Sequence, residues 1–518
     1  MSTFGLARRR FLAASLGSAA VAAPFTIVRG APIAFASDPF TLGVASGAPR
    51  EGSVVLWTRL APRPLEGGGM PDEAVQVDWQ IAEDEAFSRV VARGSEPAMP
   101  ALGHSVHVEA RGLRPGRPYW YCFRAGSAES PIGRTRTAPA VGSAPARLNF
   151  AFASCQQYEQ GYFGAYRDMA ARDLDLVVHL GDYIYEKSRG SRHVRKHEVG
   201  IPTTLAEFRD RYALYKLDAD LQAAHAAFPW LAIWDDHEVA DDYADDRSYS
   251  TRDPAQFLKM RAAAYQAYWE HMPLPASARP RGPSATIYER YRFGDLLDVM
   301  LLDDRQYRSQ PACVGAGRPG TVPDCAERTE EARTMLGKAQ EAWLNGQIRT
   351  STARWTVVAQ QTLMAELDRG TDGAHRFWMD GWDGYPNARR RLLDSIATHR
   401  PRNPVVIGGD RHAFFAADLA RDPARPPNDR EAPVASEFVG TSITSEGPNA
   451  KALAAALQVN PQVKYGRSDK RGYATVELTA AKCTVGFEAI DDEKKKDGTV
   501  RRLATFVVED GVAGVKPG

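Results

Sequence analysis

The stretch LVVHLGDYIYE, residues 176–186, joins an apolar run to a turn rich in reactive side chains. The run is apolar and β-branched, which is the composition of a buried strand. Gly181 ends it, Asp182 follows at once, and Tyr185 comes three residues later, so a tight turn can direct both oxygen donors toward one point. Carboxylate and phenolate oxygens are hard donors that ferric iron favours. The alternative interpretation is a plain strand end whose aspartate caps the next helix.

Five other apolar runs also end in polar or reactive residues. They lead into Ser154–Cys155, Asp235–Glu238, Asp303–Arg305, Gln360–Gln361 and Gly408–His412. Helical stretches, such as 163–172, 204–216 and 256–271, lie between the strands, which indicates an α/β domain. In such sheets, ligands gather beyond the carboxyl ends of the strands. The runs together predict a converged metal site.

Residues 38–140 form a different unit. Short strands at 41–47, 53–60, 75–81 and 118–124 are separated by Gly/Pro turns, which predicts a small β-sandwich of the fibronectin or immunoglobulin type. No catalytic pattern occurs in it, so we expect it to support or shade the main domain. The main domain extends over residues 147–510, because the alternating segments 473–479 and 482–490 are typical of closing strands.

Residues 1–36 are interpreted as a targeting segment. The arginines of ARRRFL (residues 7–12), a mild apolar stretch and the small-residue pattern AFA at 34–36 predict a twin-arginine signal peptide. An ordinary secretory signal is the alternative, and it also leads out of the cytoplasm. We therefore expect a periplasmic or secreted protein that meets the twin-arginine translocation machinery during export.

Composition restricts the partners. The 518 residues are 44% hydrophobic and 25% charged, and their net charge is +1. This balance argues against a dedicated nucleic-acid binder, and no later apolar run approaches the length of a bilayer span, so we infer neither a stable nucleic-acid nor a stable membrane partner. We expect a monomer. Of five cysteines, Cys313 and Cys325 flank a Gly/Pro-rich loop and should pair in an oxidising compartment.

The order of motifs resembles the alkaline phosphatase D (PhoD-like) family of the calcineurin-like metallophosphoesterase superfamily. The resemblance extends over most of residues 150–445, and it is carried by SC (154–155), GDYIYE (181–186), WDDHE (234–238), DRQYR (304–308), WDGYP (382–386), GDRH (409–412) and FVGTS (438–442). The N-terminal β-domain and the export signal also suit the family. The resemblance implies an α/β metallophosphoesterase domain of layered β-sheets flanked by helices.

The resemblance also implies a set of metal ligands. Asp182 should bridge two metal sites, one for Fe(3+) and one for Ca(2+). The ferric site is completed by Cys155, Tyr185 and His412, and the calcium site is served by Asp236 and Asp410. Oxygen ligands suit a hard divalent cation.

Two assignments stay open. Asp241 or Asp242 should contribute to the calcium side, where the family often has asparagine. Gln361 or Gln360 stands where related phosphoesterases place a histidine, and an amide oxygen disfavours zinc.

The implied function is a secreted metal-dependent alkaline phosphatase or phosphodiesterase that hydrolyses phosphate esters through a metal-activated hydroxide, for phosphate acquisition. His237 should contact the phosphate or protonate the leaving group, unless it only orients Asp236. Arg305 should clamp the phosphate, the alternative being a surface ion pair with Asp303 or Asp304.

Two other functions remain as alternatives. One is a phospholipase D-type or nucleic-acid phosphodiesterase activity, since loops around the metals decide the leaving group. The other is a non-catalytic surface binding protein, which the intact ligand set from Cys155 to His412 opposes. The aromatic segment 377–382 either lines the entrance or packs the core, and the basic segment 187–197 is expected to be a solvated loop.

Overall fold

The computed structural model describes residues 35–315, 317–422 and 432–518. The predicted signal peptide, apart from residues 35 and 36, lies outside the described residues. Within the described ranges, no helix combines the length and the apolar composition needed to cross a membrane.

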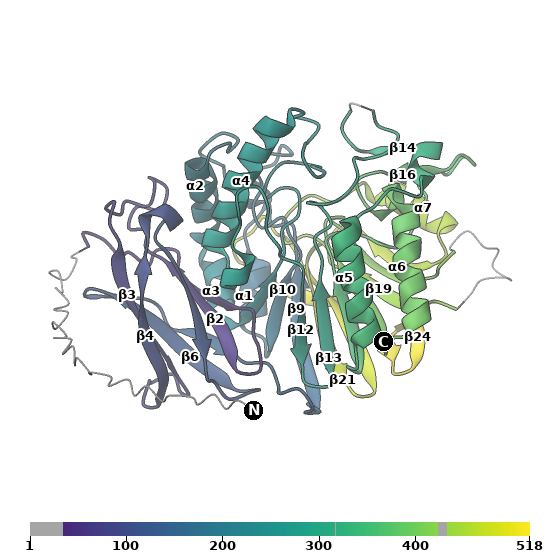
Figure 1. Cartoon of the computed structure of the whole chain (residues 1–518). Helices are drawn as coiled ribbons and strands as arrows, with labels where there is room; N and C mark the ends of the chain where they lie inside the picture. The colour runs from purple at the N-terminus through teal and green to yellow at the C-terminus, as the bar shows by residue number, and fades with distance from the viewer. Residues whose placement is uncertain (1–34, 316, 423–431) are drawn as a thin grey trace, which may run out of the picture.

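A β-sandwich forms the N-terminal part of the molecule, on the left in Figure 1. One layer is a five-stranded sheet of β3 (Val75–Ala82), β4 (Val90–Ala98), β6 (Pro118–Ala125), β7 (Ala128–Glu129) and β8 (Gly133–Arg136). The other layer contains β1 (Val44–Gly47), β2 (Ser53–Arg59) and β5 (Ser105–Arg111). Val54 and Leu56 of one layer share a buried cluster with Val77 and Tyr121 of the other. The predicted sandwich is confirmed.

This second layer continues into the main domain. β1 pairs in parallel with β11 (Pro229–Ala232), and Gly47 lies opposite Trp230. A single ten-stranded sheet results, in the order β24-β23-β22-β21-β9-β10-β11-β1-β2-β5. Its other strands are β9 (Arg147–Ala153), β10 (Leu176–His179), β21 (Arg471–Thr479), β22 (Lys482–Ile490), β23 (Val500–Glu509) and β24 (Val512–Pro517). The predicted C-terminal strands are thus part of the sheet that carries the LVVHLGD stretch.

A seven-stranded sheet forms the second layer of the main domain, in the order β12-β13-β15-β17-β19-β18-β20. The strands are β12 (Glu289–Phe293), β13 (Leu297–Leu301), β15 (Trp355–Ala359), β17 (Pro404–Gly408), β18 (Phe414–Leu419), β19 (Ala435–Val439) and β20 (Val463–Arg467). β13, β15, β17 and β19 are parallel to one another.

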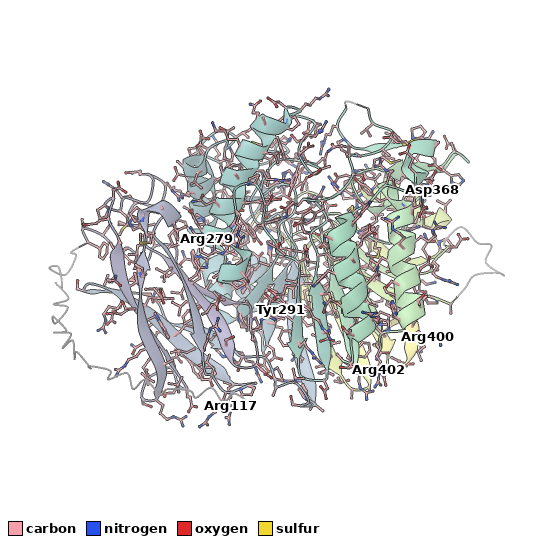
Figure 2. The ribbon with its side chains drawn as sticks, in the orientation of Figure 1. Arg117, Arg279, Tyr291, Asp368, Arg400 and Arg402 are labelled. Atoms are coloured by element: carbon pink, nitrogen blue, oxygen red, sulfur yellow. A yellow bond between two sulfur atoms is a disulfide. The ribbon has the colours of Figure 1, made fainter. Side chains whose placement is uncertain are left out.

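Period-two alternation assigns the two faces of this sheet. Val357 and Val405 belong to the core shared with the ten-stranded sheet, whereas Val358 and Val406 pack with the outer helices. Those helices are α5 (Gly337–Thr350), α6 (Pro386–His399) and α7 (Ala450–Val459). The ten-stranded sheet packs with α1 (Gly164–Ala170), α2 (Leu205–Lys216), α3 (Ala219–Ala227) and α4 (Pro254–His271). In Figure 2, Asp368 is labelled above α6, and Arg400 marks the lower end of α6, where the helix ends.

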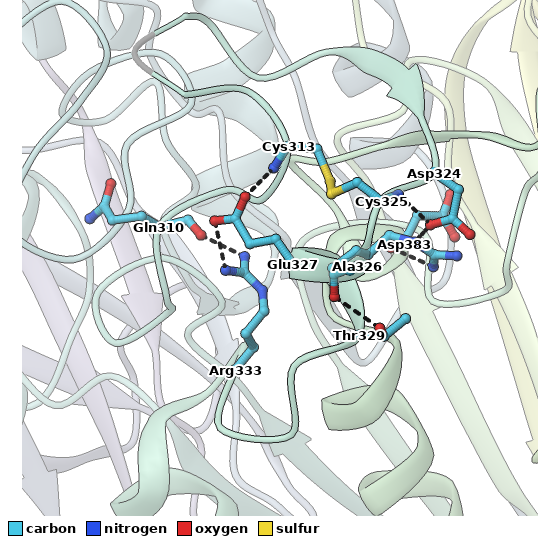
Figure 3. The surroundings of a disulfide bond; sticks show 10 residues. Gln310, Cys313, Asp324, Cys325, Ala326, Glu327, Thr329, Arg333 and Asp383 are labelled. Atoms are coloured by element: carbon cyan, nitrogen blue, oxygen red, sulfur yellow. Dashed lines mark hydrogen bonds and ion pairs between the residues drawn. A yellow bond between two sulfur atoms is a disulfide. The ribbon is translucent and has the colours of Figure 1, made fainter.

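The predicted Cys313–Cys325 disulfide is confirmed, with a Cα–Cα distance of 6.2 Å. Figure 3 shows its surroundings: the Cys313 N–H donates to Glu327 Oε2 at 2.7 Å, and Glu327 lies 3.7 Å from Arg333. Between the two cysteines lies β14 (Thr321–Pro323), which pairs with β16 (Arg376–Trp378). The disulfide therefore helps to hold the aromatic segment 377–382 in place.

Candidate metal centre

The predicted ligands meet where the two central sheets end. Residues following β9, β10 and β11 of one sheet approach residues following β17 of the other. Five of these residues have a left-handed backbone: Cys155 (φ 61°), Asp182 (54°), Asp242 (56°), Asp410 (57°) and His412 (51°). This conformation costs a non-glycine residue about 1 kcal/mol or more and accumulates at functional sites. The backbone of these turns is therefore strained, and the strain places the side chains at the centre.

Gly181 shows why the motif needs glycine. Its φ is 100°, and a Cβ there would lie 2.4 Å from Cβ of Asp235. The absence of a side chain lets the turn after β10 pack directly against the turn after β11. Asp182 is thereby brought next to the acidic residues that follow β11.

The first group of donors surrounds Asp182. Ligand atoms of Cys155, Asp182 and His412 all lie within 4.8 Å of one another. The Tyr185 hydroxyl lies 2.8 Å from Asp182 Oδ2 and 3.1 Å from His412 Nε2. Nδ1 of His412 is 2.8 Å from the Glu446 carbonyl, so Nε2 is the ring nitrogen that faces the group. All four predicted ferric ligands are brought together.

The second group consists of carboxylates and the His237 ring. Asp182, Asp236 and His237 form one close set, Asp235, Asp236 and Asp410 a second, and Asp236, Asp241 and Asp242 a third. Asp182 thus stands between the sulfur-containing group and the carboxylate sets, as the predicted bridging role requires.

The donors fit hard cations on electrostatic grounds. Asp182 Oδ1 is buried and has no hydrogen-bond partner. Burial, with Asp236 and Asp235 nearby, raises the pKa of Asp182 well above its usual range. Burial and Asp182 likewise raise the pKa of Cys155 and of Tyr185. A bound cation would lower the pKa of each of these donors, because it favours their charged forms. It would also give Asp182 Oδ1 the partner that this atom lacks.

The side chains of Gln360 and Gln361, one of which was predicted to be a metal ligand, form hydrogen bonds to other protein groups. Gln361 Oε1 accepts the Asp304 N–H at 3.2 Å, and its Nε2 donates to the carbonyls of Trp234 and Leu302. Gln360 bonds Thr362 and the Trp382 indole. In this arrangement the amides connect the strand ends of the two sheets.

Asp241 and Asp242 sit on the outer side of the carboxylate cluster, paired with cations. Asp241 bonds Lys187 at 2.8 Å and pairs with Arg189, and Asp242 bonds Arg318 at 2.8 Å. Burial, with Asp380 and Asp236, raises the pKa of Asp242 to about 7. The basic segment is therefore not a free solvated loop.

The prediction that the basic segment 187–197 is solvated is wrong for His197. Its side chain is 1% exposed, and its Nε2 lies 3.0 Å from the Tyr215 hydroxyl. Apolar and aromatic packing here was not readable from a polar stretch of sequence.

His237 is held with one ring nitrogen toward the centre. Its Nδ1 lies 2.5 Å from Glu186 Oε2, its ring stacks on Tyr185 at 4.1 Å, and its Nε2 is 3.6 Å from Asp241. The backbone N–H of His237, not the ring, donates to Asp236 Oδ1. The His237 ring therefore does not orient Asp236 through a hydrogen bond.

Arg305 is buried, not at the surface. Its Nε pairs with Asp235 and its Nη1 lies 2.7 Å from Asp380, whereas Nη2 is 3.8 Å from both Asp236 and Asp410. The alternative of a surface ion pair with Asp303 or Asp304 is wrong. The guanidinium offsets the negative charge of the carboxylate cluster, and its Nη2 lies near Asp236 and Asp410 without a hydrogen bond to either.

Several residues at the centre were not assigned from the sequence. Glu186 aligns His237; Glu238 accepts the N–H groups of Asp182 and Asp235 at 3.1 and 2.7 Å; and the Ser445 hydroxyl donates to Tyr185 at 2.8 Å. Glu186 and Glu238 lie within the quoted motifs GDYIYE and WDDHE, so their position beside ligands was the available signal.

Comparisons with known proteins agree with this geometry. A family model described as PhoD-like phosphatase matches residues 150–487, and one for the N-terminal domain of PhoD-like phosphatases matches residues 27–139. Alkaline phosphatase D of Bacillus subtilis (strain 168) is 44% identical over 490 residues, covering 93% of this chain and 83% of that protein. A solved structure described as "Structure of PhoD" is 44% identical and matches with a TM-score of 0.90, covering 94% of this chain and 93% of that chain. The chain therefore belongs to the PhoD-like phosphatase family and is a phosphoric ester hydrolase of the alkaline phosphatase D type.

Proposed function

We propose that the chain is an exported phosphatase or phosphodiesterase that uses Fe(3+) and Ca(2+) at this centre and releases phosphate from esters for uptake. The main support for this proposal is the buried donor cluster around Asp182, whose Oδ1 has no hydrogen-bond partner. Sulfur and phenol donors beside one carboxylate suit a trivalent ion, and oxygen-only donors suit calcium.

The residues divide between the two ions in the proposed arrangement. Cys155, Tyr185 and His412 would hold the ferric ion, Asp236 and Asp410 the calcium side, and Asp182 both. Bound there, the cations would lower the pKa of a water and offset phosphate charge.

His237 is proposed to transfer the proton. Glu186 holds Nδ1, so Nε2 is the atom that can give a proton to the leaving oxygen. Stacking on Tyr185 restrains the ring rotation that would misdirect Nε2.

Export is supported by two observations. The arginine-rich N-terminal segment resembles a twin-arginine signal. The Cys313–Cys325 disulfide suits an oxidising compartment.

Tyr185→Phe tests the ferric assignment by colour. A phenolate bound to ferric iron gives a visible charge-transfer band, so we expect the purified iron-loaded protein to be coloured and the variant to lose the band. Tyr183→Phe is the matched control, because the Tyr183 hydroxyl lies 2.8 Å from His225, outside the donor cluster. Because the Cys155 thiolate would also absorb when bound to ferric iron, an unchanged spectrum in Tyr185→Phe, and not a weakened one, would contradict the assignment.

The substrate class is tested with a matched aryl phosphomonoester and phosphodiester at alkaline pH, with calcium and with chelator. Chelator-sensitive turnover is the expected result. Faster turnover of the diester would identify a phosphodiesterase, and faster turnover of the monoester would identify a phosphatase. No turnover of either ester by metal-loaded protein would refute the proposal.

A further inference from the structure

Arg411 is a largely covered arginine beside the carboxylate cluster, between the candidate ligands Asp410 and His412 in sequence. Its side chain is 9% exposed. Within the described residues, its ion pair runs from Nη1 to Asp410 Oδ2 at 3.9 Å, longer than a hydrogen bond. Among the residues that the structure describes, its guanidinium has no hydrogen-bond acceptor. The guanidinium keeps a small exposed surface and has no acceptor in the described part of the protein, so its N–H groups are available to an anion that enters from solvent.

The other arginines at the centre are already engaged. Arg305 bonds Asp235 and Asp380. Arg308 donates to Asp380 Oδ1 at 2.6 Å and to the Tyr243 carbonyl at 2.7 Å. Arg318 and Arg189 pair with Asp242 and Asp241. Apart from Nη2 of Arg305, which lies 3.8 Å from Asp236 and Asp410, the guanidinium donors available to an incoming oxyanion are therefore those of Arg411.

The Arg411 guanidinium lies over the Trp378 ring. The guanidinium carbon lies 3.6 Å from the centre of the Trp378 ring. A stacked guanidinium keeps its face on the ring and presents its N–H groups at the edge, which is the geometry of bidentate contact with phosphate. Lysine could not reproduce it, since an ammonium has no planar fork.

Trp378, on which the guanidinium lies, is held in place by the pairing of its strand. Trp378 ends β16, which pairs with β14 between the two disulfide cysteines, and Thr321 lies opposite Trp378 in that pairing. The neighbouring Phe377, Met379 and Trp382 are buried, so most of the aromatic segment packs the core and Trp378 alone among these aromatic rings contacts Arg411.

We propose that Arg411, stacked on Trp378, is the side chain that binds the non-bridging oxygens of the substrate phosphate and of the released inorganic phosphate. The inference rests on the proposed function at this centre. It transfers to Arg411 the clamping role that the sequence had suggested for Arg305, whose donors neutralise carboxylates.

The test compares Arg411→Ala and Arg411→Lys with Arg376→Ala. Arg376 lies on the same strand as Trp378 and pairs with Asp372 at 2.7 Å, so its removal is a matched loss of one cation. We expect KM for an aryl phosphomonoester and the inhibition constant of inorganic phosphate to rise together, by about 10- to 100-fold in Arg411→Ala. Arg411→Lys should recover only part of this loss, and Arg376→Ala should change neither constant by more than about twofold.

Two further measurements separate binding from folding. Metal content by elemental analysis should be unchanged in the Arg411 variants, and added guanidinium ion should partly rescue Arg411→Ala but not Arg376→Ala. Trp378→Leu keeps the charge and should raise the phosphate inhibition constant by about 3- to 10-fold. If Arg411→Ala fails to fold or loses metal, Arg411→Lys and Trp378→Leu decide, and unchanged phosphate inhibition in both overturns the inference.

Failure of the proposed function has a separate signature. Titration of the metal-loaded wild-type protein with inorganic phosphate measures the anion site without turnover. Wild-type protein that binds phosphate through Arg411 but hydrolyses no ester would retain this inference and refute the activity. Active wild-type protein with an Arg411→Ala variant whose KM and phosphate inhibition stay within about twofold would retain the activity and refute this inference.

Discussion

Asp182→Asn is expected to lower kcat by about a thousandfold or more and to reduce metal content. The carboxylate is the donor shared by both groups, and its Oδ1 has no other partner. An amide removes one charge and one anionic oxygen from each predicted metal site, and the bound metals are worth several kcal/mol of transition-state stabilisation.

The measurement is turnover together with elemental analysis of iron and calcium. Glu437→Gln is the matched control, because Glu437 is equally buried but accepts backbone N–H groups from Met364 and Ala365, away from the centre. It should keep its metals. Full activity and metal content in Asp182→Asn would show that Asp182 is not the shared ligand.

Removing the metals is expected to destabilise the fold more at alkaline than at acidic pH. Burial, together with neighbouring carboxylates, raises the pKa of Asp182 and Asp235 well above the usual range, and burial raises that of Asp242 and Glu238 to about 7. The unfolded carboxylates ionise near pH 4. Stability of the stripped protein is therefore present below about pH 4 and is lost as pH rises through 7 and beyond.

Metal-loaded protein has the opposite dependence, because its ligands must be deprotonated to bind. The gap between the melting temperatures of loaded and stripped protein should widen by about 5 °C or more between pH 5 and pH 9, since each pKa unit is worth about 1.4 kcal/mol. Stripped Asp182→Asn should show a smaller fall with pH. A gap independent of pH would mean that the cluster is neutralised by protein groups alone. Buried carboxylates elsewhere, such as Glu437, affect both forms equally and cancel in the gap.

The sequence predicted the parts of the fold that depend on local pattern. The strand before Asp182 and the alternating strands near Val77 and Val476 follow from spacing of a few residues, and the disulfide closes a loop between cysteines 12 residues apart. The meeting of Cys155 with His412 was also predictable, because carboxyl ends of strands share an edge and the motifs resemble a known family.

Other features depend on pairings between distant segments. The residues around Gly47 carry no sequence pattern that predicts their pairing with Trp230. The six apolar runs likewise do not predict that their strands belong to two different sheets. Arg411 and Trp378 are 33 positions apart, and their stacking depends on how β16 is held by β14. Side-chain partners of this kind require the assembled fold.

The pairing of β1 with β11 has a consequence for the architecture as a whole. Without β1, the main sheet would end at β11 and expose a row of backbone N–H and C=O groups beside the residues that lead to Asp235. Open edges of this kind recruit strands from other molecules and lead to aggregation. The N-terminal unit thus acts as an edge cover for the hydrolase sheet, and a chain trimmed at its linker would have lost the strand that closes that edge.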